Sequence, residues 1–254
     1  MSSEAAGPPS PREPGLPGQT VVVIGGSAGI GLETARRAKA AGAEVILAGR
    51  DAARLQDAAH ELGALDTAAF DANDQGALAG LFEHLPGLVD HVMVTAGRPY
   101  YAPLADMDFD QARHALAASA MLMLGVARYS AGRVRPGGTL LFMSGTGGRR
   151  PGPGFAIISA VTAALPALAA NLALEIAPVR VNVIAAGFVD TPLSASLLGA
   201  GLDERRSQLR TTLPIGRVVG PADVAALAVH LMTNTALTGA TYDIDGGQQL
   251  LEQH

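Results

Sequence analysis

The amino-acid sequence predicts a single α/β domain with a doubly wound parallel β-sheet and helices on both faces. Three observations lead to this prediction. Short apolar runs alternate along the chain with longer Ala-rich runs of helical spacing. The strand candidates are almost continuously apolar, which is typical of strands covered on both faces. The chain has 254 residues, 48% of them hydrophobic, which suits one α/β domain with a sizeable core.

Seven short runs have the composition of buried strands, and six helical patterns lie between or after them. In chain order the strand candidates are TVVVIG, EVILAG, TAAFDA, HVMVTAG, TLLFMSG, VRVNVIAAG and ATYDID. Helical spacing covers residues 29–41, 51–62, 74–85, 108–132, 155–177 and 221–233. Pro166 falls inside the fifth helix and predicts a kink or local irregularity there. This order places one domain over residues 19–254.

Two segments depart from the alternation. Residues 1–18, MSSEAAGPPSPREPGLPG, bury too little apolar surface to order themselves, so we expect a flexible tail; a partner-binding arm is the alternative. Residues 191–217 mix apolar and charged residues before the last helix and strand. An insertion of this length predicts a cover over a substrate site, although an ordinary surface helical hairpin fits the pattern equally well.

Composition argues against several function classes. The net charge of -5 and the lack of a Lys/Arg-rich run give no field that attracts nucleic acid. The chain has no Cys, which excludes disulfides, thiolate nucleophiles and Cys-ligated zinc, and its six His residues show no metal-binding spacing. No apolar run is expected to approach the roughly 18 residues that span a bilayer. We therefore expect a soluble, cytoplasmic protein without a metal, a membrane or nucleic acid as partner.

A glycine-rich turn follows the first strand candidate, in VVVIGGSAGIGLETARRAKAAG. Gly25, Gly29 and Gly31 would permit a tight turn, close approach of the backbone to a pyrophosphate, and close helix packing. The N-terminus of the following helix would supply N–H groups and a positive dipole to the phosphates. The glycines are spaced three residues and then one, unlike the commoner dinucleotide fingerprint.

The same letters also satisfy the Gly-x-Ser-x-Gly pattern of a hydrolase nucleophile elbow. In that alternative Ser27 would be the nucleophile and His230 its base. Such an elbow normally follows several strands, one of which completes the oxyanion hole, whereas here only the tail precedes it. Ester hydrolysis by the wild type and by Ser27→Ala separates the two alternatives.

Taken together, the motifs resemble the short-chain dehydrogenase/reductase family from Thr20 to Leu250. The glycine-rich loop is similar to that family's Thr-Gly-x-x-x-Gly-x-Gly motif, with Ile24 in place of Thr. VTAG aligns with the family's Asn-Asn-Ala-Gly motif and keeps only Ala96 and Gly97 of it. RVNVIAAGFVDTP resembles the segment that holds nicotinamide, with Ala186 replacing the usual Pro. GPADVAALAVHLMTN and TGATYDIDGGQQL resemble the last helix and strand. The resemblance implies a Rossmann-type fold and a nicotinamide dinucleotide cofactor.

The segment AGRD at the end of the second strand resembles NADP-preferring members of that family. Arg50 would pair with the adenosine 2′-phosphate, and Gly49 stands where NAD-preferring members carry an Asp. NADP(H) is therefore the expected cofactor, with NAD as the alternative, and a solvated surface role is the alternative for Arg50. Asp71 would contact adenine, or else cap the third helix, for which Asn73 is better placed.

The full set of residues that the resemblance places on the cofactor combines the glycine-rich loop with the ends of later strands. It comprises Gly25, Ser27, Gly29, Ile30, Gly31, Arg50, Asp71, Ala72, Ala96, Gly97, Gly187, Val189 and Thr191.

The family's usual catalytic groups are missing. Its members use a Tyr as acid/base, a Lys four residues later that lowers the Tyr pKa, an earlier Ser that stabilises the reacting oxygen, and a helical Asn. Aligning FAIISAVTAAL on that segment puts Ile158 at the Tyr, Thr162 at the Lys, Gly145 at the Ser and Ser119 at the Asn. No change of register restores the pair, because the only lysine of the chain is Lys39. The catalytic residues are therefore unknown.

Five other residues are weaker candidates. Tyr100 and Tyr101 follow the fourth strand, where the resemblance places the rim of the substrate pocket; each could be a replacement acid or an aromatic wall. Ser144 and Thr146 could donate to a substrate oxygen or satisfy only backbone groups. Arg98 could stabilise an anionic product or lie on the surface.

Two functions remain open. The first is an NADP(H)-dependent oxidoreductase that interconverts carbonyl and alcohol on an apolar small molecule with a nonstandard proton donor; an activated, quinone-like acceptor would depend least on a protein acid. The second is an inactive dinucleotide-binding protein that works as a sensor, scaffold or partner subunit. The resemblance also implies a homodimer or homotetramer formed through the fourth and fifth helices.

Overall fold

A seven-stranded parallel sheet forms the centre of the molecule. The computed structural model describes residues 15–149 and 151–251. The strand order is β3-β2-β1-β4-β5-β6-β7, and every neighbouring pair is parallel. The strands are β1 (Thr20–Ile24), β2 (Glu44–Gly49), β3 (Asp66–Ala69), β4 (Val89–Val94), β5 (Val134–Gly145), β6 (Arg180–Ala186) and β7 (Thr241–Ile244). The predicted fold class is confirmed.

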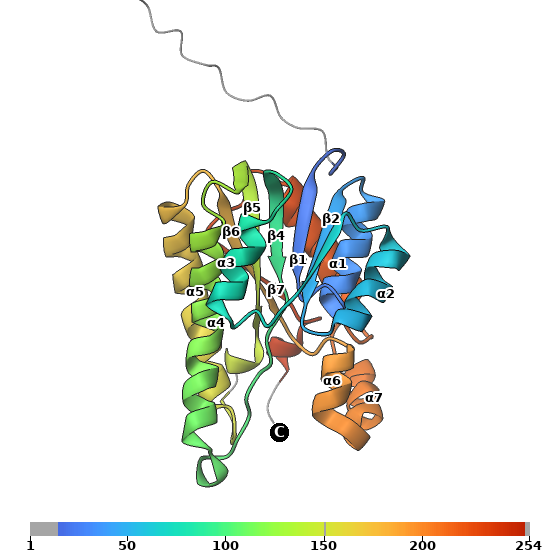
Figure 1. The fold of residues 1–254 in the computed structure, drawn as a ribbon. Helices are drawn as coiled ribbons and strands as arrows, with labels where there is room; N and C mark the ends of the chain where they lie inside the picture. Colours follow the sequence, from blue (N-terminus) through green and yellow to red (C-terminus); the bar gives the residue numbers. More distant parts are fainter. Residues whose placement is uncertain (1–14, 150, 252–254) are drawn as a thin grey trace, which may run out of the picture.

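Helices cover both faces of the sheet (Figure 1). The side chains buried with one face come from α3 (Gln75–Glu83), α4 (Phe109–Tyr129) and α5 (Ala156–Glu175). Those buried with the other face come from α1 (Gly29–Ala40), α2 (Ala52–Leu62) and α8 (Pro221–Thr233). The insertion between β6 and α8 forms α6 (Pro192–Leu198), the 3-10 helix η3 (Gly199–Gly201) and α7 (Leu202–Thr212).

The strands have almost unbroken apolar sequences because helices cover both faces of the sheet. In β1, Val22 and Ile24 belong to the core against α3, α4 and α5, whereas Val21 and Val23 belong to the core against α1, α2 and α8. Successive side chains of a strand point to opposite faces, so a strand buried on both faces needs an apolar residue at every position. The unbroken apolar runs in the sequence therefore predicted correctly that the strands are buried on both faces.

Residues 15–18, which the sequence analysis assigned to a flexible tail, contact the rest of the fold. Leu16 is fully buried in the core, and its N–H donates to Ala41 O at 3.1 Å. The expectation of a flexible tail through residue 18 is therefore wrong for residues 15–18, because the Leu16 side chain is buried in the same core as the inner side of α1. Residues 1–14 lie outside the described residues.

Helix α5 differs from one expectation. It runs from Ala156 to Glu175, and Pro166 lies inside it, so the helix continues past the proline. It is also 20 residues long with a hydropathy of 1.9, long and apolar enough by length and composition to cross a membrane. The expectation that no run approaches that length is thus wrong. In the fold α5 lies on the sheet and buries Val161, Leu165 and Leu172 in the core.

Arg180 joins the amino end of β6 to the last turn of α8. The residue is 5% exposed, and its guanidinium donates to the carbonyl oxygens of Leu231 at 2.9 Å and Met232 at 2.8 Å. It also donates to Leu237 O at 2.9 Å. A cation suits carbonyls at a helix C-terminus, where the helix dipole is negative. The C-terminus of α8 is thereby fixed at the amino edge of the sheet and its N-terminus at the carboxyl edge.

Candidate dinucleotide site and catalytic positions

The glycine-rich loop packs against the end of β4. Thr95 Oγ1 donates to Gly25 O at 3.1 Å. A Cβ placed on Gly25 would lie 2.8 Å from Ala96 N, and one on Gly31 would lie 2.6 Å from Thr95 Oγ1. Only glycine fits where backbones approach this closely. Thr95 is a site residue that the sequence analysis missed; the one available signal was a polar residue inside VTAG, directly after a buried strand.

The N-terminus of α1 is open to an anion. Ala28 at the N-cap position makes no side-chain hydrogen bond, and the first turn holds no acidic residue. The first N–H groups of a helix lack intrahelical partners, and the helix dipole places positive charge there. The loop is held by Gly25 N and Gly26 N, which donate to Ala48 O at 2.8 and 3.0 Å. The geometry fits a pyrophosphate at this end of α1.

The end of β2 brings Arg50 and Ser27 to the same place. A Cβ on Gly49 would lie 3.4 Å from Ser27 Oγ. Arg50 is exposed and forms no hydrogen bond or ion pair with any residue that the structure describes. The neighbouring Asp51 is engaged elsewhere, because its carboxylate caps α2 through Arg54 N and pairs with the Arg54 guanidinium. The guanidinium of Arg50 is therefore available to an external anion.

The turn after β3 shows that neither Asp71 nor Asn73 caps α3, so both capping alternatives of the sequence analysis are wrong. The carboxylate of Asp71 accepts from Asn73 N and Asn73 Nδ2, each at 3.0 Å. The residue that caps α3 is Asp74, which accepts from Gly76 N at 2.9 Å and Ala77 N at 3.0 Å. Asp71 and Asn73 instead shape the turn that carries the buried Ala72.

The segment after β6 meets the glycine-rich loop. Thr191 caps α6, and its side-chain carbons lie 3.5 Å from the position of a Cβ on Gly29. Val189 pairs with Val219, and a Cβ on Gly187 would lie 2.6 Å from Asp245 Cβ. Gly29 and Thr191, which stand far apart in the chain, are thus neighbours at the carboxyl edge of the sheet.

The remaining expected cofactor residues lie beside these contacts. Ile30 is half-buried in α1 and packs against the core of that face. Ala96 and Gly97 follow the carboxyl end of β4, where Ala96 N donates to Ile24 O at 3.1 Å. The predicted cofactor residues therefore line one continuous edge of the sheet, at the ends of β1, β2, β3, β4 and β6.

A second missed residue is Gln248, in the 3-10 helix η4 (Gln248–Leu250). Its Oε1 accepts from Phe188 N at 2.9 Å and so fixes the turn after β6. No local pattern could identify it, because its partner is 60 residues away in the chain.

Two of the four positions that the sequence analysis aligned with the family's catalytic residues are adjacent. Gly145 ends β5, and a Cβ placed on it would lie 3.7 Å from Thr162 Cγ2. Thr162 is 8% exposed, and its Oγ1 donates to Ile158 O at 2.8 Å and shares that proton with Ser159 O at 3.3 Å. The Thr162 hydroxyl is therefore occupied within its own helix and has no proton left for a substrate.

The loop after β5 closes over Thr162. A Cβ on Gly148 would overlap Thr162 Oγ1 and would lie 2.8 Å from Ser159 Cα. Gly148 belongs to the 3-10 helix η2 (Gly147–Arg149), which thus rests directly on α5. A lysine side chain leaving position 162 would meet this backbone.

The other two positions bring no acid to the site. Ile158 is half-buried and apolar. Ser119 lies near the middle of α4, half-buried, and its side chain forms no hydrogen bond within the part of the chain that the structure describes.

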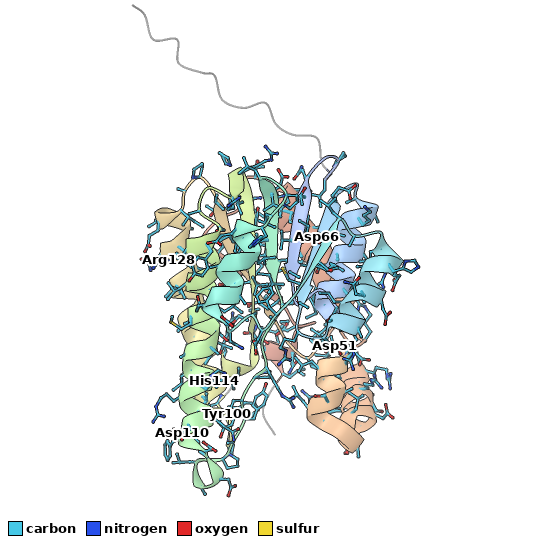
Figure 2. All side chains as sticks on the ribbon, in the orientation of Figure 1. Asp51, Asp66, Tyr100, Asp110, His114 and Arg128 are labelled. Carbon is cyan, nitrogen blue, oxygen red and sulfur yellow. The ribbon has the colours of Figure 1, made fainter. Side chains whose placement is uncertain are left out.

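Tyr100 and Tyr101 have different roles. Tyr100 lies beside the start of α4, beyond the end of the sheet (Figure 2), and its hydroxyl accepts from Asp108 N at 3.1 Å. It therefore supports the residue that caps α4. Tyr101 packs edge-to-face on Phe155, with ring centroids 5.4 Å apart. Burial raises the pKa of Tyr101 above its ordinary value, the opposite of the shift that activates the family's usual tyrosine.

The remaining weak candidates lie at the same edge. Ser144 is half-buried and opposes Ala185 of β6. Thr146 is 2% exposed, and its backbone N–H donates to Ala186 O at 2.9 Å. Arg98 is exposed and forms no hydrogen bond or ion pair with any described residue.

An arginine clasp fixes the loop after β5 to the C-terminal part of the chain. Arg149 donates to Asp243 Oδ1 at 2.7 Å and to Gln249 Oε1 at 2.9 Å. Hydrogen bonding from Arg149 lowers the pKa of Asp243 below its ordinary value. We call Arg149, Asp243 and Gln249 the C-terminal clasp.

The insertion is held at its base. Arg206 of α7 donates to both oxygens of Asp190, at 2.7 and 2.9 Å, and to Asp203 Oδ1 at 2.9 Å. A bidentate arginine–carboxylate pair fixes orientation as well as distance. Helices α6 and α7 therefore stand at a defined place at the carboxyl edge (Figure 1).

The hydrolase alternative is contradicted by the geometry. His230 lies in the last turn of α8, which Arg180 fixes at the amino edge of the sheet. Ser27 follows the carboxyl end of β1. The two side chains are at opposite ends of the strands and cannot form a nucleophile–base pair.

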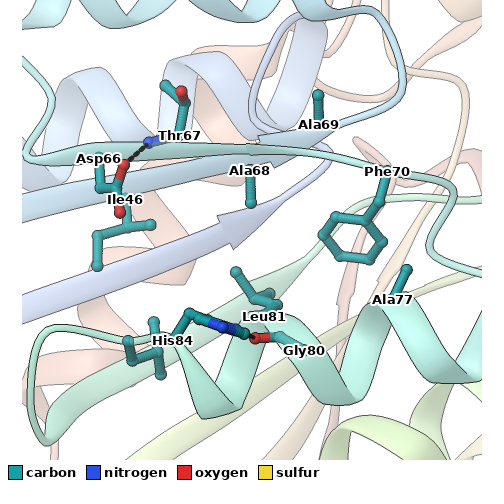
Figure 3. A pocket seen from close by; sticks show the side chains of 11 residues that line it. Ile46, Asp66, Thr67, Ala68, Ala69, Phe70, Ala77, Gly80, Leu81 and His84 are labelled. Carbon is teal, nitrogen blue, oxygen red and sulfur yellow. Dashed lines mark hydrogen bonds between the residues drawn. The ribbon is translucent and has the colours of Figure 1, made fainter.

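The hollow between β3 and α3 is separate from this site. It measures about 350 Å³ and contains none of the expected site residues (Figure 3). Its one imidazole, His84, is bonded within its own helix, with Nδ1 2.7 Å from Gly80 O. The lining residues are Ile46, Asp66, Thr67, Ala68, Ala69, Phe70, Ala77, Gly80, Leu81, His84 and Leu85.

Relatives of known identity cover almost the whole chain. A family model described as enoyl-(acyl carrier protein) reductase matches residues 25–249. The NADP-dependent (R)-specific alcohol dehydrogenase of Lentilactobacillus kefiri is 31% identical over 247 residues, covering 91% of this chain and 97% of that protein. The short-chain dehydrogenase/reductase ATR9 of Stachybotrys chlorohalonatus is 29% identical over 259 residues, covering 92% and 98%.

Solved structures show the same fold. A small-chain dehydrogenase in complex with NADPH superposes with a TM-score of 0.79 at 27% identity, covering 92% of this chain and 99% of that one. The MalC reductase/Diels-Alderase of Malbranchea aurantiaca shares the fold with a TM-score of 0.86 at 24% identity, covering 93% and 98%. The parallel sheet, the glycine-rich loop against β4 and these relatives together establish that the chain belongs to the short-chain dehydrogenase/reductase family.

Proposed function

We propose that the protein is an NADP(H)-dependent oxidoreductase that interconverts a carbonyl and an alcohol on an apolar small molecule without a tyrosine–lysine pair. The observation that carries the proposal is the open anion site made by Arg50, Ser27 and the uncapped start of α1. The Lentilactobacillus relative is named as NADP-dependent, and one solved relative contains NADPH, which supports the same cofactor for this chain.

The residues present fit a dinucleotide. Gly25 and Gly31 leave a cradle that a Cβ would fill, and the start of α1 would bind the pyrophosphate. Arg50 would form a bidentate pair with the 2′-phosphate, with Ser27 as a second donor. Gly187, Val189 and Thr191 would hold the nicotinamide end. NADPH, when bound, supplies the hydride.

The chain's own part in the reaction is to orient the cofactor and the substrate. Gly145 and Ile158 have no polar side chain, and the Thr162 hydroxyl already donates its proton to Ile158 O within α5. None of the three residues therefore offers a proton to the substrate. We propose that the substrate oxygen takes its proton from water or from a substrate hydroxyl. A protein acid contributes about 100- to 10,000-fold, so acceptors whose product anion is stabilised by resonance, such as quinone-like ketones, suit this site best.

Calorimetric titration of the wild type with NADPH and NADH tests the cofactor. We expect NADPH to bind at least tenfold more tightly than NADH, and Arg50→Ala to remove most of that difference, because one charge-assisted pair with the 2′-phosphate is lost. Arg128→Ala, another exposed arginine on the outer side of α4 (Figure 2), is the matched control. An unchanged NADPH preference in Arg50→Ala contradicts the assignment.

A specific observation favours a second function. Gly148 fills the path of the missing lysine, which fits a dinucleotide-binding protein that has lost catalysis and acts as a sensor, scaffold or partner subunit. NADPH consumption against a panel of ketones and quinones separates the two functions. Tight NADPH binding without turnover of any acceptor supports this alternative, whereas turnover of an activated ketone supports the oxidoreductase.

A further inference from the structure

The hollow between β3 and α3 has apolar walls and lies at one edge of the sheet. β3 is the edge strand on this side of the seven-stranded sheet. Ile46, Ala68 and Phe70 point from the strands toward α3, and Leu81 points back from the helix (Figure 3). Its volume of about 350 Å³ is within the range of binding sites for small apolar groups.

Small residues keep the hollow open. Gly80 lies inside α3, where glycine is less favourable than alanine. A Cβ placed on Gly80 would meet no atom of the described residues within 4 Å, other than its own helix and chain neighbours. Ala68 and Ala77, on the two walls, are also small. β3 and α3 therefore leave a space between them that neither element fills.

An exposed carboxylate stands at one end of the hollow. Asp66 Oδ1 accepts from Thr67 N at 2.7 Å, and the Asp66 side chain forms no ion pair with any residue that the structure describes. The imidazole of His84 on the opposite wall is bonded within its own helix, with Nδ1 2.7 Å from Gly80 O. This end of the hollow therefore suits an apolar segment that carries a cation.

The chain itself carries a segment of this chemistry before the first strand. Prolines stand at every third position, at 8, 11, 14 and 17, and Arg12 is the one basic residue of residues 1–14. A polyproline II helix repeats every three residues, so prolines at this spacing share one face of such a helix. Proline-rich segments bind in grooves lined by aromatic and apolar side chains. We call residues 8–14 the proline arm.

The last proline of the series is packed on the fold. A Cβ placed on Gly42 would lie 3.2 Å from Pro17 Cα. Leu16 N donates to Ala41 O at 3.1 Å, and Leu16 is fully buried. These contacts fix the chain next to the proline arm at the amino edge of the sheet, beside the turn between α1 and β2.

The end of the hollow that carries the carboxylate lies toward the same edge. β3 begins at Asp66, and α3 runs in the opposite direction and ends just before His84. β3 is two strands away from β1, which is roughly 10 Å across the sheet. Seven residues span about 22 Å in a polyproline II helix. The proline arm is therefore long enough to reach the hollow from its attachment at the amino edge.

We propose that the proline arm binds in the hollow between β3 and α3, with its prolines against Phe70 and Leu81 and with Arg12 beside Asp66. Prolines lose little conformational entropy on binding, and the arginine pairs with the carboxylate at the exposed end. The contact covers an edge strand, which would otherwise present unpaired backbone groups to other chains. It lies apart from the proposed dinucleotide site and forms with or without a cofactor.

Limited trypsin digestion of the full chain tests the contact, because the bond between Arg12 and Glu13 lies within the proline arm. Cleavage of a segment that opens and closes rapidly follows the population of its open form. We expect the wild type to be cut after Arg12 about tenfold more slowly than a synthetic peptide of residues 1–18, which corresponds to an arm that is bound about nine-tenths of the time.

The spacing of the prolines supplies a matched pair of variants. Pro8→Ser, Pro11→Ser and Pro14→Ser combined should bring cleavage to within about twofold of the peptide rate, because the packed face is lost. Pro9→Ser lies off the three-residue period and should keep the wild-type protection. Each rate is divided by that of a synthetic peptide with the same substitutions, which removes the effect of the changed sequence on trypsin itself.

A variant in the hollow tests the other partner. Gly80→Leu should fill the space in front of Gly80 and bring cleavage after Arg12 close to the peptide rate, while leucine favours the helix. Gly201→Leu is the control, because a Cβ on Gly201 also meets no described residue nearby, although Gly201 lies in η3 and lines no part of the hollow. Circular dichroism confirms that both variants are folded; if Gly80→Leu does not fold, the proline variants decide.

Three results overturn the proposal. The first is cleavage of the wild type at the peptide rate. The second is protection that persists in folded Gly80→Leu or in the triple proline variant, which places the arm elsewhere. The third is protection that rises with protein concentration, which shows that the arm binds a second copy of the chain.

Discussion

At the scale of single residues, the contact between Thr162 and Gly148 leaves little room for a longer side chain at position 162. The hydroxyl of Thr162 is bonded to Ile158 O, and Gly148 rests on it. A lysine needs room for four methylenes and a path to solvent. Here the backbone of the loop after β5 occupies that path.

We therefore predict that Thr162→Lys destabilises the protein by about 1 to 3 kcal/mol, the usual cost of forcing extra atoms into a packed site. Urea unfolding followed by circular dichroism measures the change. Ala163→Lys, at the next and exposed position of α5, is the control and should stay within about 0.5 kcal/mol of the wild type. Equal stability of Thr162→Lys and the wild type would show that the loop moves aside freely.

At the scale of elements, the C-terminal clasp links the loop after β5 to β7 and η4. Hydrogen bonding from Arg149 lowers the pKa of Asp243, so the folded state favours the carboxylate. A depressed carboxyl pKa contributes stability above its unfolded value of 3.8, and this contribution is lost as the pH falls through the lower, folded value. Both side chains are more than a third exposed, so solvent reduces the contribution.

The clasp makes a prediction about pH. Arg149→Gln should be less stable than the wild type at neutral pH, and the difference should shrink as the pH falls through the lowered pKa of Asp243, because protonation removes the carboxylate charge. Thermal unfolding at a series of pH values measures it. Arg113→Gln, which breaks an exposed pair within one helix, should show a smaller difference at neutral pH. A difference in stability that stays constant down to the lowest pH rules out an electrostatic clasp.

Much of the element scale could be predicted from the sequence. Strands buried on both faces have an unbroken apolar pattern, and the glycine-rich loop is marked by glycines that close backbone approach requires. The contacts that complete the site could not be predicted, because they join distant parts of the chain, as in Thr95 on Gly25 and Gln248 on Phe188. The cap of α3 at Asp74 was missed because Asp71, Asn73 and Asp74 lie within four residues and each residue type can cap a helix.

At the scale of the whole molecule, the carboxyl edge is divided by chemistry. The half formed by β1, β2 and β3 presents Ser27, Arg50 and Asp71, and the half from β4 to β7 presents leucine and aromatic side chains. The polar half would suit the phosphate end of the proposed dinucleotide, and the apolar half would suit the proposed apolar substrate. Of the four positions aligned with the family's catalytic residues, Ser119 alone has a hydroxyl without a partner among the described residues, so the proposed function rests more on the division of the edge than on those positions.

The outer surface of α4 and α5 carries a second apolar region. Leu116, Met121 and Leu124 of α4 are 45%, 49% and 42% exposed, and Leu174 of α5 is 80% exposed. The two helices lie side by side on one face of the sheet (Figure 1). We propose that a second copy of the chain covers this surface in a homodimer or homotetramer, since a stable interface buries about 800 Å² on each partner.

Sedimentation measures the oligomeric state. We expect the wild type to be larger than a monomer, and Met121→Glu with Leu124→Glu to dissociate it, because buried carboxylates without partners are costly. Leu88→Glu, an exposed leucine outside this surface, should keep the wild-type mass. A monomeric wild type removes the proposal.

The C-terminal clasp also bears on how the protein can be handled in the laboratory. Gln248 and Gln249, within a few residues of the chain end, bind the turn after β6 and the loop after β5. A purification tag or an immobilisation anchor joined to the C-terminus would therefore be attached close to both the turn after β6 and the loop after β5. Joined at the N-terminus it would act near the amino end of β1, at the opposite edge of the sheet, so the choice of tagged end decides whether cofactor affinity is measured on an undisturbed site.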